Sequence, residues 1–151
     1  MTTKTITGTD GIDSILIADS SPTPGFNVTL NAVSSGPFLD DTLNISVRFG
    51  ADTIDLTTLT PASGVLNATI SGGEGADTIR DSASDDALFG DEGNDTFTVV
   101  VGGGGGDGLD TVMETTSATS LLSFKYQPRS IPTVWLKRKS ICAKKTITRC
   151  I

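Results

Sequence analysis

Aspartates recur every nine residues in the middle of the chain, accompanied by glycines. From Gly72 the sequence divides into three adjacent nine-residue units, GGEGADTIR (72–80), DSASDDALF (81–89) and GDEGNDTFT (90–98). The sixth residue of each unit is an aspartate: Asp77, Asp86 and Asp95. Aspartate supplies a hard anionic oxygen, while glycines permit positive φ angles and leave carbonyl oxygens unshielded. Because calcium takes about six to eight oxygen ligands in a flexible shell, the spacing predicts turns that wrap a calcium ion.

The same units have a large apolar residue at their eighth position: Ile79, Leu88 and Phe97. In each unit six residues suit a turn and three suit a short strand. We expect the apolar residue of each strand to point inward and to give successive coils a thin shared core.

Further copies flank these units. After the insertion VVVGGG, the segment GGDGLDTVM (105–113) restores the pattern with Asp110 and Val112, while a competing register starting at Gly102 uses Asp107 and Leu109. We prefer the first register because it repeats the Asp-Thr-apolar triplet. Weaker copies are GTDGIDSIL (8–16), GPFLDDTLN (36–44) and VRFGADTID (47–55). Their irregular spacing supports a regular coil only from about Gly72.

Between the weaker copies, apolar residues alternate with Thr and Asn. One series is Phe26, Val28, Leu30 and Ala32, and the next is Leu43, Ile45, Val47 and Phe49. Alternation with a period of two predicts half-buried β-strands. No helical periodicity is evident before the last segment, so we expect an all-β fold.

Charge divides the chain near Glu114. Residues 1–114 hold all 18 acidic residues and three basic ones, for a net charge of −15, whereas residues 115–151 hold eight basic residues and none that is acidic. A charge of −15 disfavours binding to nucleic acid, and bound cations would relieve its self-repulsion. We therefore expect three parts: degenerate repeats and strands (1–71), a calcium-binding roll (72–114) and a basic tail (115–151).

Several functional classes conflict with the composition. The 151 residues contain no histidine, which excludes Ser-His-Asp and Cys-His catalytic sets and HExxH zinc sites, so we expect no enzyme activity. No segment approaches the roughly 20 apolar residues of a membrane helix. The N-terminal residues have no apolar run typical of a cleavable signal peptide.

The units GGEGADTIR, GDEGNDTFT and GGDGLDTVM closely resemble the GGxGxDxUx repeats of RTX (hemolysin-type calcium-binding) proteins. The resemblance is strong over residues 72–113 and partial over 8–55. It implies a short right-handed parallel β-roll in which two units make one turn, so that turns 18 residues apart share a calcium ion.

Carried over to this sequence, the resemblance makes Asp77 and Asp95 face one ion. Carbonyl oxygens would come from the same two turns, at Gly73, Gly75, Asp91 and Gly93. On the opposite edge Asp86 has Ala68, which carries no carboxylate, as its upstream counterpart, so its site is weak or depends on Asp110 across the insertion. In the competing register Asp107 is the candidate ligand instead of Asp110.

Other interpretations fit less well. A flexible acidic linker has this composition but not three consecutive units in phase. An EF-hand over 81–92 would have Ala83 at a ligand position and Asp86 where glycine is needed. Residues 102–106 could form a phosphate-binding loop, yet no Lys-Ser/Thr follows. The tail, with KRKS (137–140), could bind nucleic acid or a membrane surface; we interpret it instead as an unstructured or foreign extension, which the other reading frames of the gene would test.

The function expected from the sequence is calcium binding by a structural module or fragment of a secreted, RTX-like protein or cell-surface assembly. The alternative is the accessory repeat domain of a secreted protease or lipase whose catalytic part is absent, since neither HExxH nor GxSxG occurs. The family is exported by type I secretion, which implies an extracellular location.

Overall fold

The computed structural model describes residues 1–21, 24–60, 63–101, 110–114, 121–126 and 135–138. These residues are all-β, as predicted, with no α-helix among them. In the described ranges no helix has the length and apolar character needed to cross a membrane. The strands are β1 (Thr3–Thr7), β2 (Ser14–Asp19), β3 (Phe26–Leu30), β4 (Val33–Phe38), β5 (Thr42–Ser46), β6 (Thr53–Thr58), β7 (Asn67–Ser71), β8 (Thr78–Arg80), β9 (Asp85–Phe89), β10 (Thr96–Val101), β11 (Thr111–Glu114), β12 (Leu121–Tyr126) and β13 (Trp135–Arg138).

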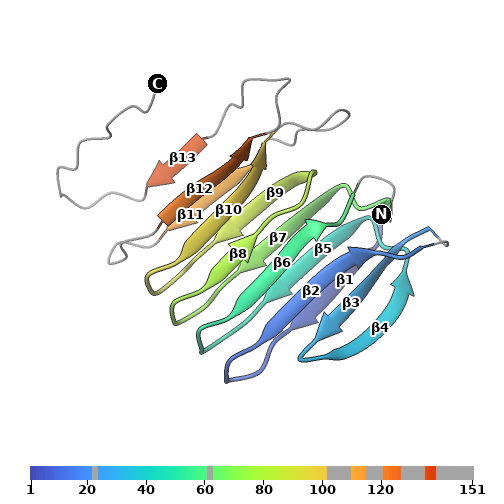
Figure 1. The fold of residues 1–151 in the computed structure, drawn as a ribbon, viewed down its shortest axis with the longest axis horizontal. Helices are drawn as coiled ribbons and strands as arrows, with labels where there is room; N and C mark the ends of the chain where they lie inside the picture. The colour runs from blue at the N-terminus through green and yellow to red at the C-terminus, as the bar shows by residue number, and fades with distance from the viewer. Residues whose placement is uncertain (22–23, 61–62, 102–109, 115–120, 127–134, 139–151) are drawn as a thin grey trace.

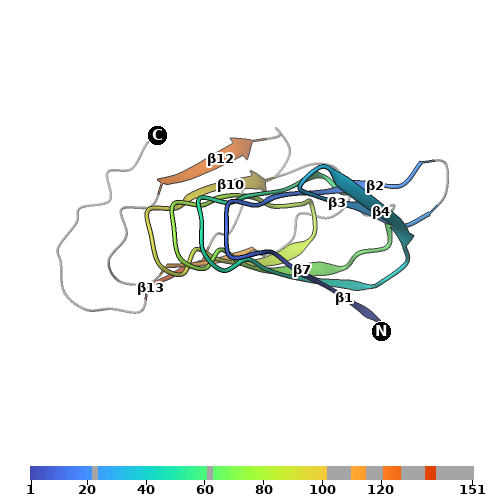
Figure 2. The same cartoon turned by 90° about the horizontal axis from the view of Figure 1, so that it is seen from below.

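Successive strands lie mostly in alternate sheets. The six-stranded sheet has the order β1-β5-β7-β9-β11-β13, and the seven-stranded sheet has the order β12-β10-β8-β6-β2-β3-β4. Figure 1 shows the strands stacked side by side, with β3 and β4 at the end of the stack beyond β2, and Figure 2 shows the two sheets as two layers joined by turns. Pairing is parallel except where β3 pairs with β2 and β4, which makes the larger sheet mixed. The arrangement is consistent with a β-roll.

The core lies between the two layers and consists of apolar side chains stacked in register. One such stack in the seven-stranded sheet comprises Ile15, Ile54, Ile79 and Phe97. Fully burying one such side chain contributes about 1.5–3 kcal/mol. The inward orientation expected for the eighth residue of each unit is confirmed, since all of these residues are buried: Ile79, Leu88, Phe97 and Val112.

Parallel pairing begins well before Gly72, although the spacing of the repeats there is irregular. β1 pairs with β5, and β2 pairs with β6. Between successive coils of the seven-stranded sheet the register advances by 39 residues from Ser14 to Thr53, by 25 to Thr78 and by 18 to Thr96. The extra residues lie outside the stacked strands, so a coil forms without a constant sequence period.

The hairpin of β3 and β4 accounts for the largest of these steps. Phe26 is fully buried and its ring centroid lies 5.7 Å from that of Phe38, over which the Lys4 ammonium lies at 3.6 Å. The alternation that predicted Ala32 on the buried face is wrong at that residue. Ala32 is exposed because it forms the hairpin turn with Asn31, where both residues have positive φ angles (67° and 49°).

Phe49 is a second correction to the alternation. It follows buried Leu43, Ile45 and Val47 at the same spacing, yet it is 47% exposed. The strand β5 ends at Ser46, and Phe49 lies beyond that end, in the turn that leads to β6. The alternating sequence pattern thus continues past the residue at which the strand ends.

Two described segments of the basic tail are strands. β12 pairs in parallel with β10, and β13 pairs in parallel with β11. An unstructured tail is therefore wrong for these two segments, because the outer edges of β10 and β11 leave backbone groups for another strand to pair with. The foreign origin of the tail stays a prediction, and its other residues lie outside the described ranges.

Candidate metal-binding turns

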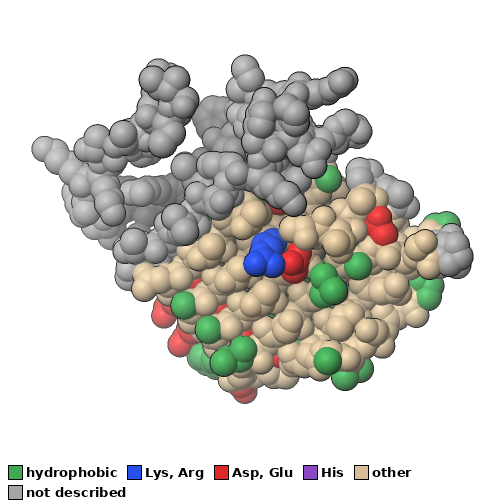
Figure 3. Space-filling model, in the orientation of Figure 1, with side chains coloured by type: hydrophobic (Ala, Val, Ile, Leu, Met, Phe, Trp, Pro, Cys, Tyr) green, Lys and Arg blue, Asp and Glu red, His purple; other side chains and the backbone are tan. Residues whose placement is uncertain are grey.

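Four turns lie one above another along one edge of the molecule, each leading into a strand of the seven-stranded sheet. They comprise residues 8–13, 47–52, 72–77 and 90–95, which precede β2, β6, β8 and β10. Figure 1 shows them as a series of loops at the lower left, and Figure 3, in the same orientation, shows acidic side chains along this edge. The edge thus collects negative charge from parts of the chain far apart in sequence.

The last residue of each turn is an aspartate, and the four form a continuous stack that we call the aspartate column: Asp13, Asp52, Asp77 and Asp95. From Asp52 onward, the Oδ1 of each member accepts a hydrogen bond from the backbone N–H of the preceding member, at 2.7, 2.8 and 2.9 Å along the column. Asp77 and Asp95, which the sequence predicts to share one ion, are therefore adjacent.

The column is buried, with every member 1% exposed. In the described part of the chain, the Oδ2 atoms of Asp52 and Asp77 are buried and have no hydrogen-bond partner. Burial, together with the charges of Asp95 and Asp52, raises the pKa of Asp77 to about 6, and burial likewise raises the pKa of Asp52 and Asp95. Buried carboxylate oxygens without donors are costly unless a cation compensates them. The donor set of hard oxygens fits calcium.

Glycine is required where the turn backbones touch. Gly75 and Gly93 have φ angles of +142° and +147°. A Cβ on Gly93 would lie 1.4 Å from the carbonyl oxygen of Gly75, and a Cβ on Gly75 would lie 1.5 Å from that of Gly50. Successive turns therefore approach through bare backbone, which keeps carbonyl oxygens close to the column.

Gly73 and Asp91 occupy the same position in successive turns, and both have positive φ angles (82° and 62°). The Asp91 carboxylate reaches back to the preceding turn, where it accepts hydrogen bonds from the Ser71 hydroxyl and the Gly73 N–H. The Gly73 carbonyl accepts a hydrogen bond from Glu92 N–H at 2.8 Å and retains a second lone pair. Residues 73, 75, 91 and 93, predicted as ligands, thus belong to two stacked turns.

The opposite edge carries a second acidic group. Asp86 N–H donates to Asp110 Oδ1 at 3.0 Å, and Asp86 Oδ1 accepts from Ala68 N–H at 2.8 Å, so Asp86 lies between its two expected counterparts. Carboxylate oxygens of Asp81, Asp86 and Asp110 lie within 4.8 Å of one another, all buried. Burial raises the pKa of Asp110 to about 7. Asp107, from the competing register, lies outside the described residues.

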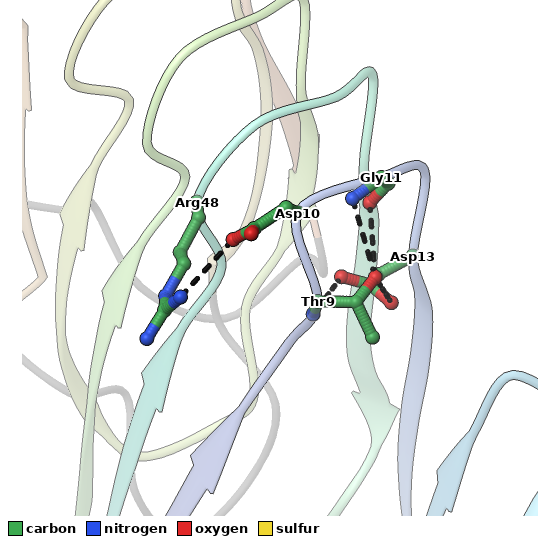
Figure 4. Close-up of polar contacts among 5 residues, drawn as sticks. All are labelled: Thr9, Asp10, Gly11, Asp13 and Arg48. Atoms are coloured by element: carbon green, nitrogen blue, oxygen red, sulfur yellow. Dashed lines mark hydrogen bonds and ion pairs between the residues drawn. The ribbon is translucent and has the colours of Figure 1, made fainter.

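The first turn satisfies its aspartate with protein donors instead. Asp13 accepts hydrogen bonds from Thr9 N–H (2.6 Å), the Thr9 hydroxyl (3.1 Å) and the Asn31 amide (2.7 Å). Figure 4 shows the Thr9 side chain inside this turn, close to Asp13 and Gly11. Burial alone would raise the pKa of Asp13, but these hydrogen bonds outweigh it and leave the pKa below its usual value.

Sequence reasoning omitted three acidic residues of these groups from the predicted ligands: Asp13, Asp52 and Asp81. Asp13 and Asp52 hold the sixth position of the weaker copies, so their place in the pattern is visible in the sequence but their alignment with Asp77 is not. Asp81 stands where the repeat normally has glycine, and the buried group that it forms with Asp86 and Asp110 depends on pairing across the insertion.

Comparison with known proteins agrees with this geometry over part of the chain. Residues 64–97 match the family model of the RTX calcium-binding nonapeptide repeat (4 copies). No curated protein and no solved structure matches the chain. Repeats of this family bind Ca²⁺ and form a structural, non-catalytic module. Residues 64–97 are therefore RTX calcium-binding nonapeptide repeats.

Proposed function

We propose that this chain is a calcium-binding structural module whose stacked turns complete their folding when calcium binds. The observation that carries this proposal is the aspartate column, whose stacked carboxylates are all buried. In the described residues, no hydrogen-bond donor contacts the Oδ2 atoms of Asp52 and Asp77. The match of residues 64–97 to calcium-binding repeats supports the same ligand.

One ion is held between turns 72–77 and 90–95. Asp77 and Asp95 supply carboxylate oxygens, and the backbone at Gly73, Gly75, Asp91 and Gly93 supplies carbonyl oxygens. The Oδ1 of Asp95 accepts a hydrogen bond from Asp77 N–H, which fixes the orientation of the Asp95 carboxylate beside the turn of Asp77. Calcium supplies the positive charge that the three basic residues of the first 114 residues do not.

A second site lies on the opposite edge. There Asp86 and Asp110 provide carboxylates, and Asp81 adds a third where the repeat usually has glycine. The Ser82 N–H and hydroxyl already donate to Asp86 Oδ2, at 3.0 and 2.8 Å, so this site is partly satisfied without metal. We expect weaker calcium binding here than at Asp77 and Asp95.

The module belongs to a secreted RTX-like protein and forms a right-handed β-roll. The alternation of strands between two mainly parallel sheets supports the roll. Secretion rests on the family resemblance, and the alternative setting, beside a protease or lipase domain, is distinguished by the neighbouring coding sequence. In either setting the module has a structural function, and its acidic first 114 residues bind the calcium.

Far-UV circular dichroism of the full chain tests the proposal. Addition of millimolar calcium to protein in EDTA should increase the β-signal, whereas the same concentration of magnesium, which demands a stricter octahedral shell, should do so far less. A spectrum that calcium leaves unchanged would contradict the proposal.

A further inference from the structure

A second pair of turns on the calcium-binding edge lies partly outside the family match. Turn 47–52 precedes the matched residues 64–97, and it stands 25 residues before its neighbour 72–77 instead of 18. Its first three residues are Val47, Arg48 and Phe49, where the repeat has two glycines and a polar residue. From the sequence it is a degenerate copy without a predicted ligand.

The backbone nevertheless reproduces the contacts of the 72–77/90–95 pair. Gly50 N–H donates to Glu74 O at 2.9 Å and Glu74 N–H to Arg48 O at 2.7 Å. The equivalent bonds of the next pair are 2.7 Å, from Gly75 to Glu92, and 2.8 Å, from Glu92 to Gly73.

The close approach of the glycines is reproduced too. A Cβ on Gly75 would meet the Gly50 oxygen at 1.5 Å, as one on Gly93 would meet the Gly75 oxygen at 1.4 Å. The two pairs of turns therefore share the same backbone contacts.

Both carboxylates that border the upstream space have an unused oxygen. Asp52 and Asp77 are each 1% exposed, and their Oδ2 atoms are buried without a hydrogen-bond partner in the described ranges. Their Oδ1 atoms accept from the N–H groups of Asp13 and Asp52. Since two adjacent turns each bury an anionic oxygen without a described hydrogen-bond donor, a cation is the ligand that their chemistry calls for.

The basic side chain nearest in sequence does not fill this role. The Arg48 guanidinium donates to Asp10 at 3.1 Å, and its side chain is 59% exposed. Figure 4 shows Arg48 directed at Asp10 and away from Asp13. The Arg48 side chain thus lies on the surface, whereas the Arg48 carbonyl stays within the turn, where it accepts from Glu74 N–H.

In turn 8–13, the first turn of the column, protein hydrogen bonds replace the need for a metal. Asp13 accepts three hydrogen bonds from Thr9 and Asn31, whereas Asp52 accepts one, from Asp13 N–H. These hydrogen bonds from Thr9 and Asn31 stabilise the buried Asp13 carboxylate without a cation.

We propose that a further calcium ion binds between turns 47–52 and 72–77, with Asp52 and Asp77 as its carboxylate ligands, and that the column ends at Asp13 without a metal. This inference rests on the proposed calcium-binding function and extends it upstream of the family match. Asp77 is then shared by two ions, one on each side.

Counting bound calcium by native mass spectrometry of the full chain tests the inference. Asp52→Asn keeps the Oδ1 acceptor and should bind one ion fewer than the unmodified chain, as should Asp95→Asn, while Asp77→Asn should lose two. Glu74→Gln removes an exposed charge from the same turn and should keep the full count. An unchanged count in Asp52→Asn overturns the inference and leaves the proposed function intact, whereas an unmodified chain that binds no calcium overturns both.

Hydrogen exchange on the unmodified chain gives a readout that does not depend on a variant folding. Calcium should slow exchange in turns 47–52, 72–77 and 90–95 and leave turn 8–13 unchanged. Slowing confined to 72–77 and 90–95 overturns the inference.

Discussion

The first member of the aspartate column and a member in its middle compensate their buried charge in different ways. Asp13, at the N-terminal end, is buried but accepts hydrogen bonds from Thr9 and Asn31, and its pKa lies below the usual value. Asp77, in the middle, is equally buried, has an Oδ2 without a described donor, and its pKa is raised to about 6. The difference shows that stacking alone does not create a need for metal. The need arises where no described side-chain donor reaches the buried carboxylate, as at Asp77.

Calcium removal should produce the largest effect, because it acts on the middle of the column and not on its first turn. One site at 100-fold excess calcium over Kd contributes about 2.7 kcal/mol, a large fraction of the stability of a small domain. Differential scanning calorimetry should show a much lower unfolding temperature in EDTA than in excess calcium. Equal unfolding temperatures would mean that the column is satisfied without metal.

Substitution of the stacked glycines should rank next. Gly93→Ala would place a Cβ 1.4 Å from the Gly75 carbonyl oxygen at a φ of +147°, which we expect to cost about 1–3 kcal/mol. Gly11→Ala is the matched control in the first turn, where a Cβ meets nothing within 4 Å. Urea denaturation in calcium should show a large loss for the first variant and little for the second; similar losses would contradict the stacked geometry.

Acidity should affect the calcium-free chain in a direction set by the raised pKa values. An unfolded aspartate ionises near 3.8 and folded Asp77 near 6, so between these values the unfolded state releases its proton first. Stability of the calcium-free chain should therefore fall as pH rises through this window. Thermal unfolding in EDTA should occur at a higher temperature at pH 4.5 than at pH 7.5; the reverse order would show that the column is not desolvated.

The smallest effect should come from the first turn. Thr9→Ala removes one hydroxyl hydrogen bond to Asp13, worth about 1 kcal/mol, and the loss should be the same with and without calcium. Asp10→Asn, which breaks an exposed ion pair with Arg48, should change the free energy of unfolding by less than about 1 kcal/mol. A Thr9→Ala loss that calcium reverses would place a metal in the first turn.

The fold of residues 72–98 could largely be predicted from the sequence, because apolar residues, turn glycines and aspartates there recur with the same nine-residue spacing. The inward positions of Ile79, Leu88 and Phe97 required only that period. The upstream coils were harder, since parallel pairing of Thr53 with Thr78 depends on backbone registry and tolerates a 25-residue step. Phe49 and Ala32 were misplaced because an alternating pattern does not reveal where a strand ends.

The candidate site divides in the same way. Asp77 and Asp95 stand 18 residues apart in clean units, so their proximity could be predicted. Asp52 could not be predicted as a ligand from the sequence, because Arg48 and Phe49 replace residues of the repeat pattern in its turn. Its hydrogen bond to Asp77 joins residues 25 apart in the chain, a spacing that the nine-residue repeat does not contain. The donors of Asp13 come partly from Asn31 in the hairpin, 18 residues away, and no repeat pattern contains that contact.

Isothermal titration of calcium into the full chain and into the Asp77→Ala/Asp95→Ala double variant tests the central claim most directly. The unmodified chain should bind calcium with a Kd of about 10⁻⁴ to 10⁻³ M, typical of extracellular modules, and the double variant should lose the binding assigned to this edge. Identical titrations of the two proteins would contradict the account.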